Sequence, residues 1–338
     1  MTLTDPLFLS RRLSRSLYRR DVLALGLATL LPAVARAERA EDWPAKSIRL
    51  VVPYAAGGSS DTLGRLIARH LQDALKQTVV VENKGGAGGL IGSKEVAKAA
   101  PDGYTLVISG IGSHVIAPVE SPTFDPMKDF SHIALLGGPP LAMVVNAQQP
   151  IKDVKEFISY TQGSAKGISW GSPGQGTHGH LTGELFRQIN KLNMVHIAYK
   201  GAGPAVADLI GNQIPAAFMT LSSANAHVDS GKLRLLAVSA SQRVAAYPNT
   251  PTLAELGYPQ LTGTTWFSVS GPAGLPPAIT ERLNTEIRRG LQTPAVRTAM
   301  NNESMETAVY DAASFTRFVA AEIARWSPAV KSLGGTAK

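Results

Sequence analysis

A short apolar run that ends in a glycine-rich loop and continues into a helical pattern constrains this fold more than any other feature. The run is residues 48–52, the loop is residues 53–61 with Gly57 and Gly58, and the helical pattern begins near Leu63. Adjacent glycines let backbone N–H groups approach a ligand, and the first turn of a helix adds unsatisfied N–H donors and the positive end of its dipole. The loop holds no evident nucleophile or general base, so we expect it to bind an anion.

A second junction of the same kind lies in the other half of the chain, at residues 169–179. Gly174, Gly176 and Gly179 match the G-x-G-x-x-G spacing of dinucleotide-binding loops. However, the following strand, residues 194–200, lacks the acidic residue that would hold a ribose. The sequence therefore disfavours a dinucleotide and indicates a second loop for holding an anion.

The same region also matches the nucleophile elbow of serine hydrolases, G-x-S-x-G, at residues 167–171. That elbow needs its serine on the turn with a helix directly after it, whereas Ser169 is expected in a strand and residues 171–173 intervene. An exported serine hydrolase using Ser169 or Ser172 stays open as the alternative function. It predicts covalent labelling by a fluorophosphonate.

Short apolar runs alternate with helical patterns, at residues 48–52, 78–81 and 105–108 and again later. This alternation predicts an α/β fold with mainly parallel sheets. The clearest helical face runs from Leu63 to Leu75, and we expect Ser60 or Asp61 to cap its start. Further helical faces are predicted from Leu181 to Ile189, from Ile279 to Leu291 and from Phe315 to Trp326.

Several polar side chains near the junctions leave more than one interpretation open. Asp61 either caps its helix or turns into the cleft to select a ligand with an ammonium or hydroxyl group. His178 and His180 lie about 200° apart on a helix and cannot share one ion, so we expect no metal site. Thr177 or His178 is expected to donate a hydrogen bond from a helix N-terminus. Lys200 either adds a positive charge to the cleft or stays solvated.

The first 37 residues have the pattern of a secretory signal. Arginines precede an apolar stretch at residues 22–31, and residues 35–37 (Ala-Arg-Ala) form a small-x-small cleavage site. About ten apolar residues are too few to span a bilayer. Arg19 and Arg20, shortly before the apolar stretch, also resemble a twin-arginine signal. We therefore predict a chain that is exported and cleaved near Ala37, by the general or the twin-arginine route.

Removal of the signal changes what the net charge means. The 33 basic and 25 acidic side chains of the whole chain fall to 27 and 23, and no Lys or Arg run follows the signal. Nucleic acid is therefore not an expected partner. The absence of cysteine excludes disulfides, thiolate metal sites and a cysteine nucleophile. The remaining 301 of the 338 residues are enough for two domains.

A set of short motifs occurs in a specific order, at residues 43–44, 52–61, 81–89, 101–104, 199–201 and 251–259. Together they resemble the signatures of the Bug family, the solute-binding receptors of tripartite tricarboxylate transporters. The resemblance implies a type II periplasmic binding protein, an α/β Venus flytrap of two domains joined by two crossover segments. It places domain 1 at residues 43–142 and 263–338, and domain 2 at residues 143–262.

The resemblance also implies where a ligand binds, because in this family a carboxylate is held between one loop of each domain, largely by backbone groups and bridging waters. One wall is expected to consist of Tyr54, Ala55, Ala56, Gly57, Gly58 and Asp61. The other wall is expected to consist of Ser172, Gly174, Gly176, Thr177 and His178. The residues expected nearby are Gly112, Ser113, His114, Tyr199 and Lys200.

The implied function is capture of a small organic carboxylate in the periplasm and its delivery to membrane permease subunits. The ligand class includes dicarboxylates, tricarboxylates, amino acids and aromatic acids. We expect a monomer without catalytic residues, cofactor or metal, and a sensor without its own permease is a further alternative. Three positions depart from the family pattern: Tyr54 replaces the more usual Phe, residues 84–86 replace Arg-Pro-Gly, and His178 replaces a small residue. The His178 departure predicts an altered ligand choice.

Overall fold

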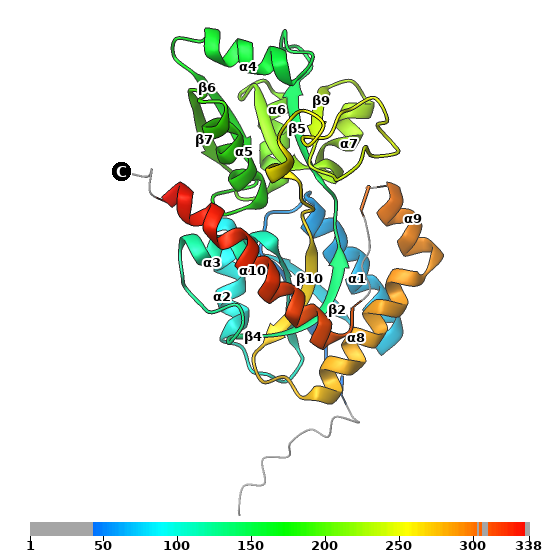
Figure 1. Ribbon diagram of the computed structural model, residues 1–338. Helices are drawn as coiled ribbons and strands as arrows, with labels where there is room; N and C mark the ends of the chain where they lie inside the picture. The colour runs from blue at the N-terminus through cyan, green and yellow to red at the C-terminus, as the bar shows by residue number, and fades with distance from the viewer. Residues whose placement is uncertain (1–42, 303, 306–309, 335–338) are drawn as a thin grey trace, which may run out of the picture. The chain divides into compact units, whose positions relative to one another are not determined.

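The computed structural model describes residues 43–302, 304–305 and 310–334 (Figure 1). The predicted signal peptide, residues 1–37, lies outside the described residues. None of the described helices combines the length and the apolar character that a membrane span requires.

The first of two sheets has the strand order β2-β1-β3-β10-β4. Its strands are β1 (Ile48–Val52), β2 (Val79–Asn83), β3 (Thr105–Gly110), β4 (Phe130–Gly137) and β10 (Phe267–Pro272). The helical elements associated with it are α1 (Ser59–Leu75), η1 (Ala87–Gly89), α2 (Leu90–Ala97), η2 (Gly112–Ile116), α3 (Ala117–Glu120), α8 (Pro277–Gln292) and α9 (Pro294–Asn302). We call this sheet and its helices the first lobe.

The second sheet has the strand order β7-β6-β8-β5-β9. Its strands are β5 (Leu141–Asn146), β6 (Ile168–Ser172), β7 (Met194–Ala198), β8 (Ala216–Thr220) and β9 (Leu233–Val238). The helical elements associated with it are α4 (Val154–Gly163), α5 (His178–Ile189), α6 (Ala202–Ile210), α7 (Leu221–Asp229) and η3 (Pro259–Leu261). We call this sheet and its helices the second lobe, which Figure 1 shows above the first.

The two strands that directly follow a crossover from one sheet to the other are antiparallel to both of their neighbours. β1 pairs in parallel with β2 and β3, and β6 pairs in parallel with β7 and β8. In contrast, β10 is antiparallel to β3 and β4, and β5 is antiparallel to β8 and β9. Four of the five strands in each sheet therefore run in one direction, as the prediction of mainly parallel sheets requires, and β5 and β10 are the reversed strands. β5 and β10 arrive from the other lobe rather than through a βαβ connection, so nothing imposes parallel pairing on them.

Two crossover segments connect the lobes and pair with each other. Residues 138–140 lead from β4 to β5, and residues 262–266 lead into β10. The Thr265 N–H donates to the Pro139 carbonyl over 2.9 Å. The two α/β lobes and their two crossovers agree with the predicted fold class. The first crossover ends earlier than the predicted boundary at residue 142, because Leu141 already pairs with β8.

The predicted helical faces pack as core. Leu63, Ile67 and Leu71 of α1 are fully buried in the core of the first lobe. Side chains of this kind each contribute about 1.5–3 kcal/mol when they are removed from water. The predicted faces from Leu181, Ile279 and Phe315 correspond to α5, α8 and the C-terminal helix α10 (Ala312–Gly334).

The start of α1 differs from the prediction. Its N-cap is Gly58, with no capping side chain, rather than Ser60 or Asp61. Asp61 instead lies in the first turn, where its carboxylate accepts the N–H of Gly57 over 3.2 Å. The carboxylate therefore supports the loop that precedes the helix.

Helix α10 links both lobes to the second crossover (Figure 1). It contacts β4, η2, α3 and α8 in the first lobe and α5 in the second. Its buried Glu322 carboxylate accepts the indole N–H of Trp266 over 2.9 Å and that of Trp326 over 3.2 Å. Any movement of one lobe relative to the other would therefore change the packing of α10 on at least one of them.

Candidate functional site

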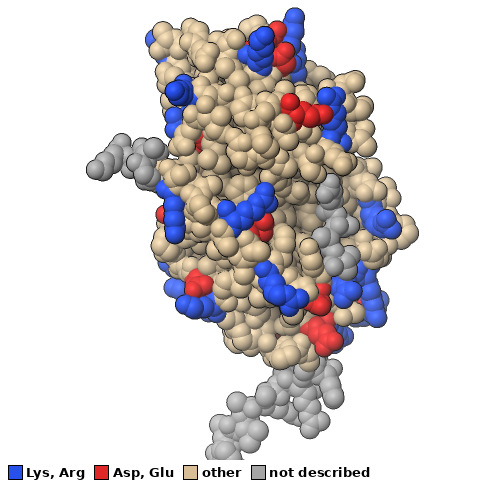
Figure 2. All heavy atoms as spheres, in the orientation of Figure 1, with Lys and Arg blue, Asp and Glu red and all other residues tan. Residues whose placement is uncertain are grey.

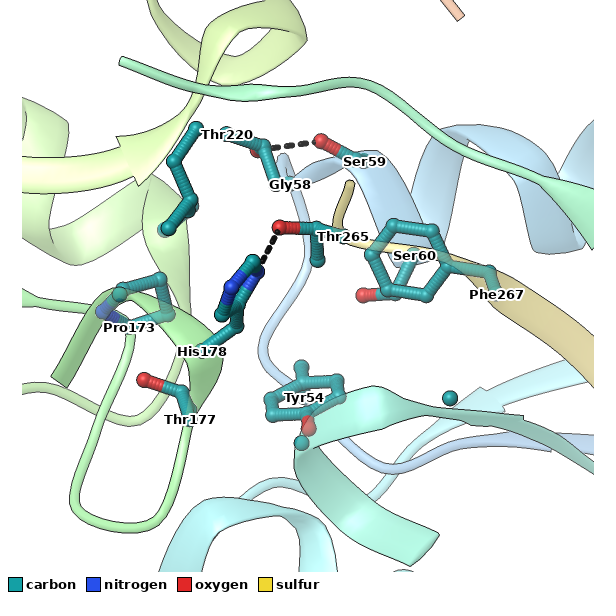
Figure 3. Close-up of a pocket in the computed structure, with 15 residues that line it drawn as sticks. Tyr54, Gly58, Ser59, Ser60, Pro173, Thr177, His178, Thr220, Thr265 and Phe267 are labelled. Carbon is teal, nitrogen blue, oxygen red and sulfur yellow. Dashed lines mark hydrogen bonds between the residues drawn. The ribbon is translucent and has the colours of Figure 1, made fainter. Parts of the chain in front are cut away.

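A cavity of about 50 Å³ lies between the two lobes (Figure 3). Its walls come from both sheets' strand ends, the loops that follow them and the second crossover. The lining residues are Tyr54, Gly58, Ser59, Ser60, Gly110, Gly112, Leu141, Pro173, Thr177, His178, Gly179, Ala202, Thr220, Thr265 and Phe267.

Four helices begin at this cavity. Gly58 is the N-cap of α1 in the first lobe, and Thr177 is the N-cap of α5 in the second. Ala202 is the first residue of α6, and Thr220 is the N-cap of α7. The first N–H groups of a helix lack intrahelical acceptors and carry the positive end of its dipole. Both lobes therefore direct hydrogen-bond donors and partial positive charge at one small volume, an arrangement that suits an anion.

Tyr54 contributes an aromatic ring to the first wall. Its hydroxyl donates to the Gly88 carbonyl over 2.9 Å. Burial raises the pKa of the Tyr54 hydroxyl, so this group stays protonated. A Cβ at Gly112 would lie 2.7 Å from the Tyr54 hydroxyl oxygen. A tyrosine at position 54 therefore requires the absence of a side chain at position 112.

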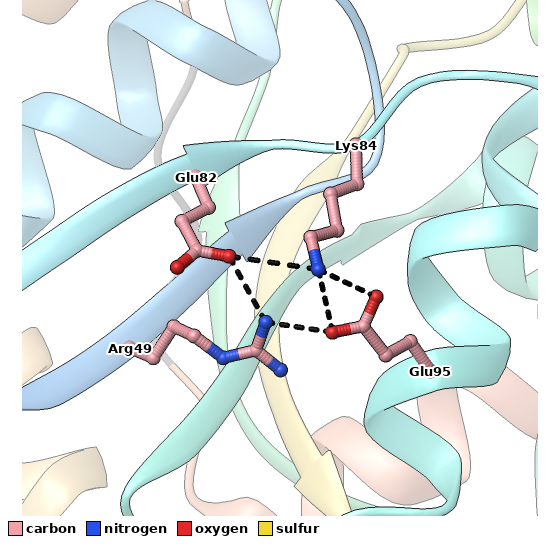
Figure 4. A network of polar contacts seen from close by, with 4 residues as sticks. All are labelled: Arg49, Glu82, Lys84 and Glu95. Carbon is pink, nitrogen blue, oxygen red and sulfur yellow. Dashed lines mark hydrogen bonds and ion pairs between the residues drawn. The ribbon is translucent and has the colours of Figure 1, made fainter.

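A network of four charged residues holds the loop that carries Gly88 (Figure 4). Arg49 contacts Glu82 at 3.0 Å and Glu95 at 2.7 Å, and Lys84 contacts Glu95 at 2.7 Å. The hydrogen bond from Lys84 is the largest cause that lowers the pKa of Glu95. The four side chains are half-buried, and ion pairs that remain open to solvent each contribute about 0–1 kcal/mol. The network matters for position, because it links β1, β2 and α2 behind the cavity.

Thr177 organises the second wall. Its hydroxyl donates to the Gly174 carbonyl over 2.7 Å and accepts the N–H of His180 over 3.3 Å. The second contact is the helix-capping bond that a threonine N-cap makes. The expectation that Thr177 contributes to a helix N-terminus agrees with this geometry, although its side chain accepts rather than donates the capping bond.

His178, the first residue of α5, ties the second wall to the second crossover. Its Nδ1 lies 2.9 Å from Thr265 Oγ1 (Figure 3). Its ring packs on that of Trp326 at 5.3 Å between centroids. Burial, together with a smaller effect of the Arg325 charge, lowers the pKa of His178 to about 3. His178 is therefore neutral near pH 7, and its Nε2 has no partner among the described residues.

Direct contacts between the lobes border the cavity. Ser59 Oγ lies 2.5 Å from Thr220 Oγ1 and 3.1 Å from Ser223 Oγ, and it also contacts Ser222 Oγ. On the same side, the Ala55 N–H donates to the Lys200 carbonyl over 2.8 Å. The structure therefore has the lobes closed on each other.

The structure divides the predicted ligand-binding residues into two groups. Those that line the cavity are Tyr54, Gly58, Gly112, Thr177 and His178. Those outside its lining are Ala55, Ala56, Gly57, Asp61, Ser113, His114, Ser172, Gly174, Gly176, Tyr199 and Lys200. Many of the second group neighbour the first in sequence and shape the backbone of the two loops.

Asp61 is held by groups outside the cavity. Its Oδ2 accepts hydrogen bonds from the Gly57 N–H at 3.2 Å and from Arg65 Nε at 3.1 Å. Its Oδ1 accepts from Asn83 Nδ2 at 3.0 Å and lies 3.1 Å from an Arg65 terminal nitrogen. Both oxygens are thus engaged, and the carboxylate does not turn into the cavity.

Ser113 and His114 lie behind the cavity rather than on its wall. Their side chains are buried and bonded to each other, with Ser113 Oγ 3.0 Å from His114 Nδ1. The His114 ring packs on Phe130 at 4.4 Å between centroids. Burial is the largest cause that lowers the pKa of His114. The glycine-rich turn made these residues candidates, but the turn alone does not tell which side of the sheet they enter.

Several cavity residues were absent from the predicted site, namely Ser59, Ser60, Gly110, Leu141, Pro173, Gly179, Ala202, Thr220, Thr265 and Phe267. Ser59 and Ser60 belong to the first glycine-rich loop, so a wider reading of that loop would have included them. Thr220 ends β8 and caps α7, which makes it a further strand-to-helix junction. Thr265 follows from the pairing of the crossovers, which has no local sequence signal.

One of the two serines considered for the hydrolase alternative, Ser172, has a histidine partner. Ser172 Oγ lies 2.7 Å from His196 Nε2. Ser172 is fully buried and outside the cavity lining, and burial lowers the pKa of His196 to about 3. A general base needs a pKa near the operating pH, which this histidine lacks. This pair is therefore not arranged as an activated nucleophile.

A larger and more polar hollow of about 340 Å³ lies beside α5, with Glu120, Glu184, Arg187, His180 and His196 in its lining. The rings of His180 and His196 stack at 4.4 Å between centroids. No group of three or more His, Asp or Glu side chains among the described residues is placed to hold a metal ion. The starts of α5 and of the short helix α3, whose N-cap is Ile116, lie at this hollow, whereas four helices begin at the cavity between the lobes.

Two α/β lobes around a shared cavity define a solute-binding protein of the periplasmic type. Residues 63–335 match the family described as tripartite tricarboxylate transporter family receptor. The chain belongs to this family, which is one of solute-binding receptors, and the resemblance to Bug proteins is confirmed.

Curated and solved relatives support this assignment. The chain is 34% identical to Protein BugT of Bordetella pertussis over 94% of this chain and 99% of BugT. A structure of R. palustris Rpa4515 with adipate has a TM-score of 0.83 and 32% identity, covering 87% of this chain and 99% of that one. A structure of MatC from Rhodopseudomonas palustris with bound malate has a TM-score of 0.82 and 30% identity, covering 85% and 100%.

Proposed function

We propose that this protein captures a small organic carboxylate in the cavity between its lobes and delivers it to the membrane subunits of a tripartite tricarboxylate-type transporter. The observation that carries the proposal is the convergence of four helix N-termini from both lobes on one cavity. The adipate and malate in the structures of relatives support a carboxylate ligand. Export to the periplasm and cleavage near Ala37 belong to the same proposal.

Ligand binding and lobe closure are expected to form one equilibrium. Only the closed state brings the helix N-termini of both lobes to the ligand together, so an anion binds this state more tightly than an open one. In the cavity, the loop from Tyr54 to Gly58 and the loop from Ser172 to His178 are the proposed ligand-holding segments. Backbone groups provide most of the contacts in this proposal.

Thermal unfolding with added ligands tests the proposed function. The protein is expressed from the full sequence and purified from the periplasmic fraction, and its mass gives the cleavage site. A ligand present at about 100 times its dissociation constant adds roughly 2.7 kcal/mol to the free energy of unfolding. We expect at least one small carboxylate to raise Tm, whereas an equal concentration of chloride does not. No shift with dicarboxylates, tricarboxylates, amino acids or aromatic acids would contradict the proposal.

The hydrolase alternative is tested on the same sample. We expect no labelling of the folded protein by a fluorophosphonate, because Ser172 is buried and its histidine partner is a weak base. Labelling that Ser172→Ala abolishes would favour the hydrolase instead. Transport in cells with and without the permease genes distinguishes a transport receptor from a sensor that has no permease.

A further inference from the structure

The wall of the cavity between the lobes carries no full charge. Among its described lining residues there is no Asp, Glu, Lys or Arg. His178 is the only titratable base in the lining, and burial holds it neutral. The strongest electrostatic feature of the wall is therefore the partial positive charge of the helix N-termini.

Acidic groups near the cavity are engaged elsewhere. Asp61 uses both carboxylate oxygens for Gly57, Asn83 and Arg65, as described above. In the second lobe, the Asp208 carboxylate accepts the Tyr199 hydroxyl over 2.7 Å, outside the cavity lining. No carboxylate on the described wall can thus neutralise a cationic group of a ligand.

Side-chain hydroxyls on the wall come from Tyr54, Ser59, Ser60, Thr177, Thr220 and Thr265, and those of Tyr54 and Thr177 already donate to backbone carbonyls. A hydroxyl can donate to a carboxylate oxygen and can also exchange hydrogen bonds with a ligand hydroxyl. An ammonium group would find acceptors here but no opposite charge, and it would face the positive ends of the helices. Burying a charge without a partner charge is costly.

We infer that this cavity selects carboxylates without an ammonium group, taking a dicarboxylate or hydroxydicarboxylate in preference to the matching amino acid. The inference rests on the proposed function and narrows its ligand class. The two carboxylates of such a ligand can accept hydrogen bonds from helix N-termini of both lobes. A ligand hydroxyl can exchange hydrogen bonds with serine and threonine side chains of the wall.

Calorimetric titration with succinate, L-malate and L-aspartate at pH 7.5 tests the inference, because these acids differ at one carbon by hydrogen, hydroxyl or ammonium. We expect succinate or malate to bind at least tenfold more tightly than aspartate. Aspartate binding as tightly as succinate and malate would overturn the inference but leave the proposed function standing. Absence of binding by every carboxylate would overturn both.

A matched pair of variants tests the physical cause. Ser60 lies in the first turn of α1, is buried and lines the cavity (Figure 3). Ser60→Asp places a carboxylate on the wall where the helix tolerates one, and Ser60→Asn is its uncharged control. We expect Ser60→Asp to raise the aspartate-to-succinate affinity ratio at least tenfold over Ser60→Asn. An equal ratio in both variants would contradict the electrostatic cause, and the titrations of the unmodified protein decide the inference even if Ser60→Asp does not fold.

Discussion

The two glycine-rich loops perform the same task with different supports. The first loop leads into α1 without a capping side chain, and its acidic residue Asp61 faces away from the cavity. The second loop leads into α5 through the Thr177 cap, and His178 binds Thr265 in the crossover. The Asp61 side chain thus supports the first loop from within its own lobe, whereas His178 attaches the second loop to a crossover that joins the lobes. We therefore expect substitutions in the two loops to differ in their effects on the free energy of unfolding and on ligand affinity.

The largest expected effect is a loss of folding stability when the packing within the second lobe is disturbed at Gly179. A Cβ at Gly179 would lie 2.4 Å from the Phe218 carbonyl oxygen, and this backbone cannot move cheaply. We expect Gly179→Ala to lower the free energy of unfolding by about 1–3 kcal/mol in urea titrations. An unchanged unfolding midpoint would show that the second wall is loosely packed.

Gly58→Ala is the matched change in the first wall. Its Cβ would meet the Ala202 Cβ at 3.2 Å, across the gap between the lobes. Because this contact exists only between lobes, we expect little change in unfolding but weaker ligand binding. Equal losses of stability in Gly58→Ala and Gly179→Ala would contradict the distinction between the two loops.

Acid should affect the second loop through His178. The folded pKa is about 3, below the ordinary value of about 6.5, so the unfolded chain binds the proton more readily. The contribution of His178 to stability is thus complete above pH 6.5 and is lost as pH falls from 6.5 toward 3. At pH 5.5 the loss is about 1.4 kcal/mol for this one group.

His178→Asn provides the comparison, since its amide can retain a hydrogen bond to Thr265. We expect the difference in unfolding free energy between pH 7.5 and 5.5 to be smaller in the variant by about 1.4 kcal/mol. His132, which is also buried and whose pKa is lowered to about 4 by burial, is the control, as His132→Asn should flatten the profile without changing ligand affinity. The same pH slope in His178→Asn and the unmodified protein would show that His178 is not buried in solution.

Closure should depend on the hydroxyl cluster around Ser59. A neutral hydrogen bond contributes about 0.5–1.5 kcal/mol, so Ser59→Ala should weaken ligand binding by roughly twofold to tenfold. Tm without ligand should change little, because the contacts of Ser59 connect separate lobes. Ser223→Ala removes the longer contact with Ser59 and a 2.7 Å bond to Thr220 within the second lobe, but leaves the 2.5 Å contact between Ser59 and Thr220, and it should have a smaller effect on ligand binding. Titration calorimetry gives both values, and stronger binding in Ser59→Ala would reverse the proposed role of the cluster.

The smallest effect on binding is expected from Asp61→Asn. The carboxylate supports the first loop and does not reach the cavity, so affinity should change less than twofold while Tm falls by the loss of bonds to Arg65 and Asn83. A large loss of affinity that is selective for amino acids would contradict this and show that Asp61 contacts the ligand's ammonium group.

The sequence was sufficient where the signal is local. The spacing of Leu63, Ile67 and Leu71 predicted α1, because helical periodicity depends on neighbouring residues alone. Gly58 and Thr177 were predicted at the two strand-to-helix junctions for the same reason. These features place the two loops and the alternation of strands and helices.

The parts that could not be predicted depend on contacts between distant segments. The antiparallel direction of β5 and β10 follows from the return of the chain between lobes, which no local pattern records. Thr220 and Thr265 reach the cavity only because α7 and the second crossover meet there. Asp61 was ambiguous for a related reason, since its partner Asn83 comes from a different strand.

A crystal structure of the protein with bound L-malate tests the central claim most directly. The account predicts malate in the cavity between the lobes, with carboxylate oxygens about 2.7–3.2 Å from backbone N–H groups in the first turns of both α1 and α5. Malate held by one lobe alone, or bound in the hollow beside His180 and His196, would contradict it.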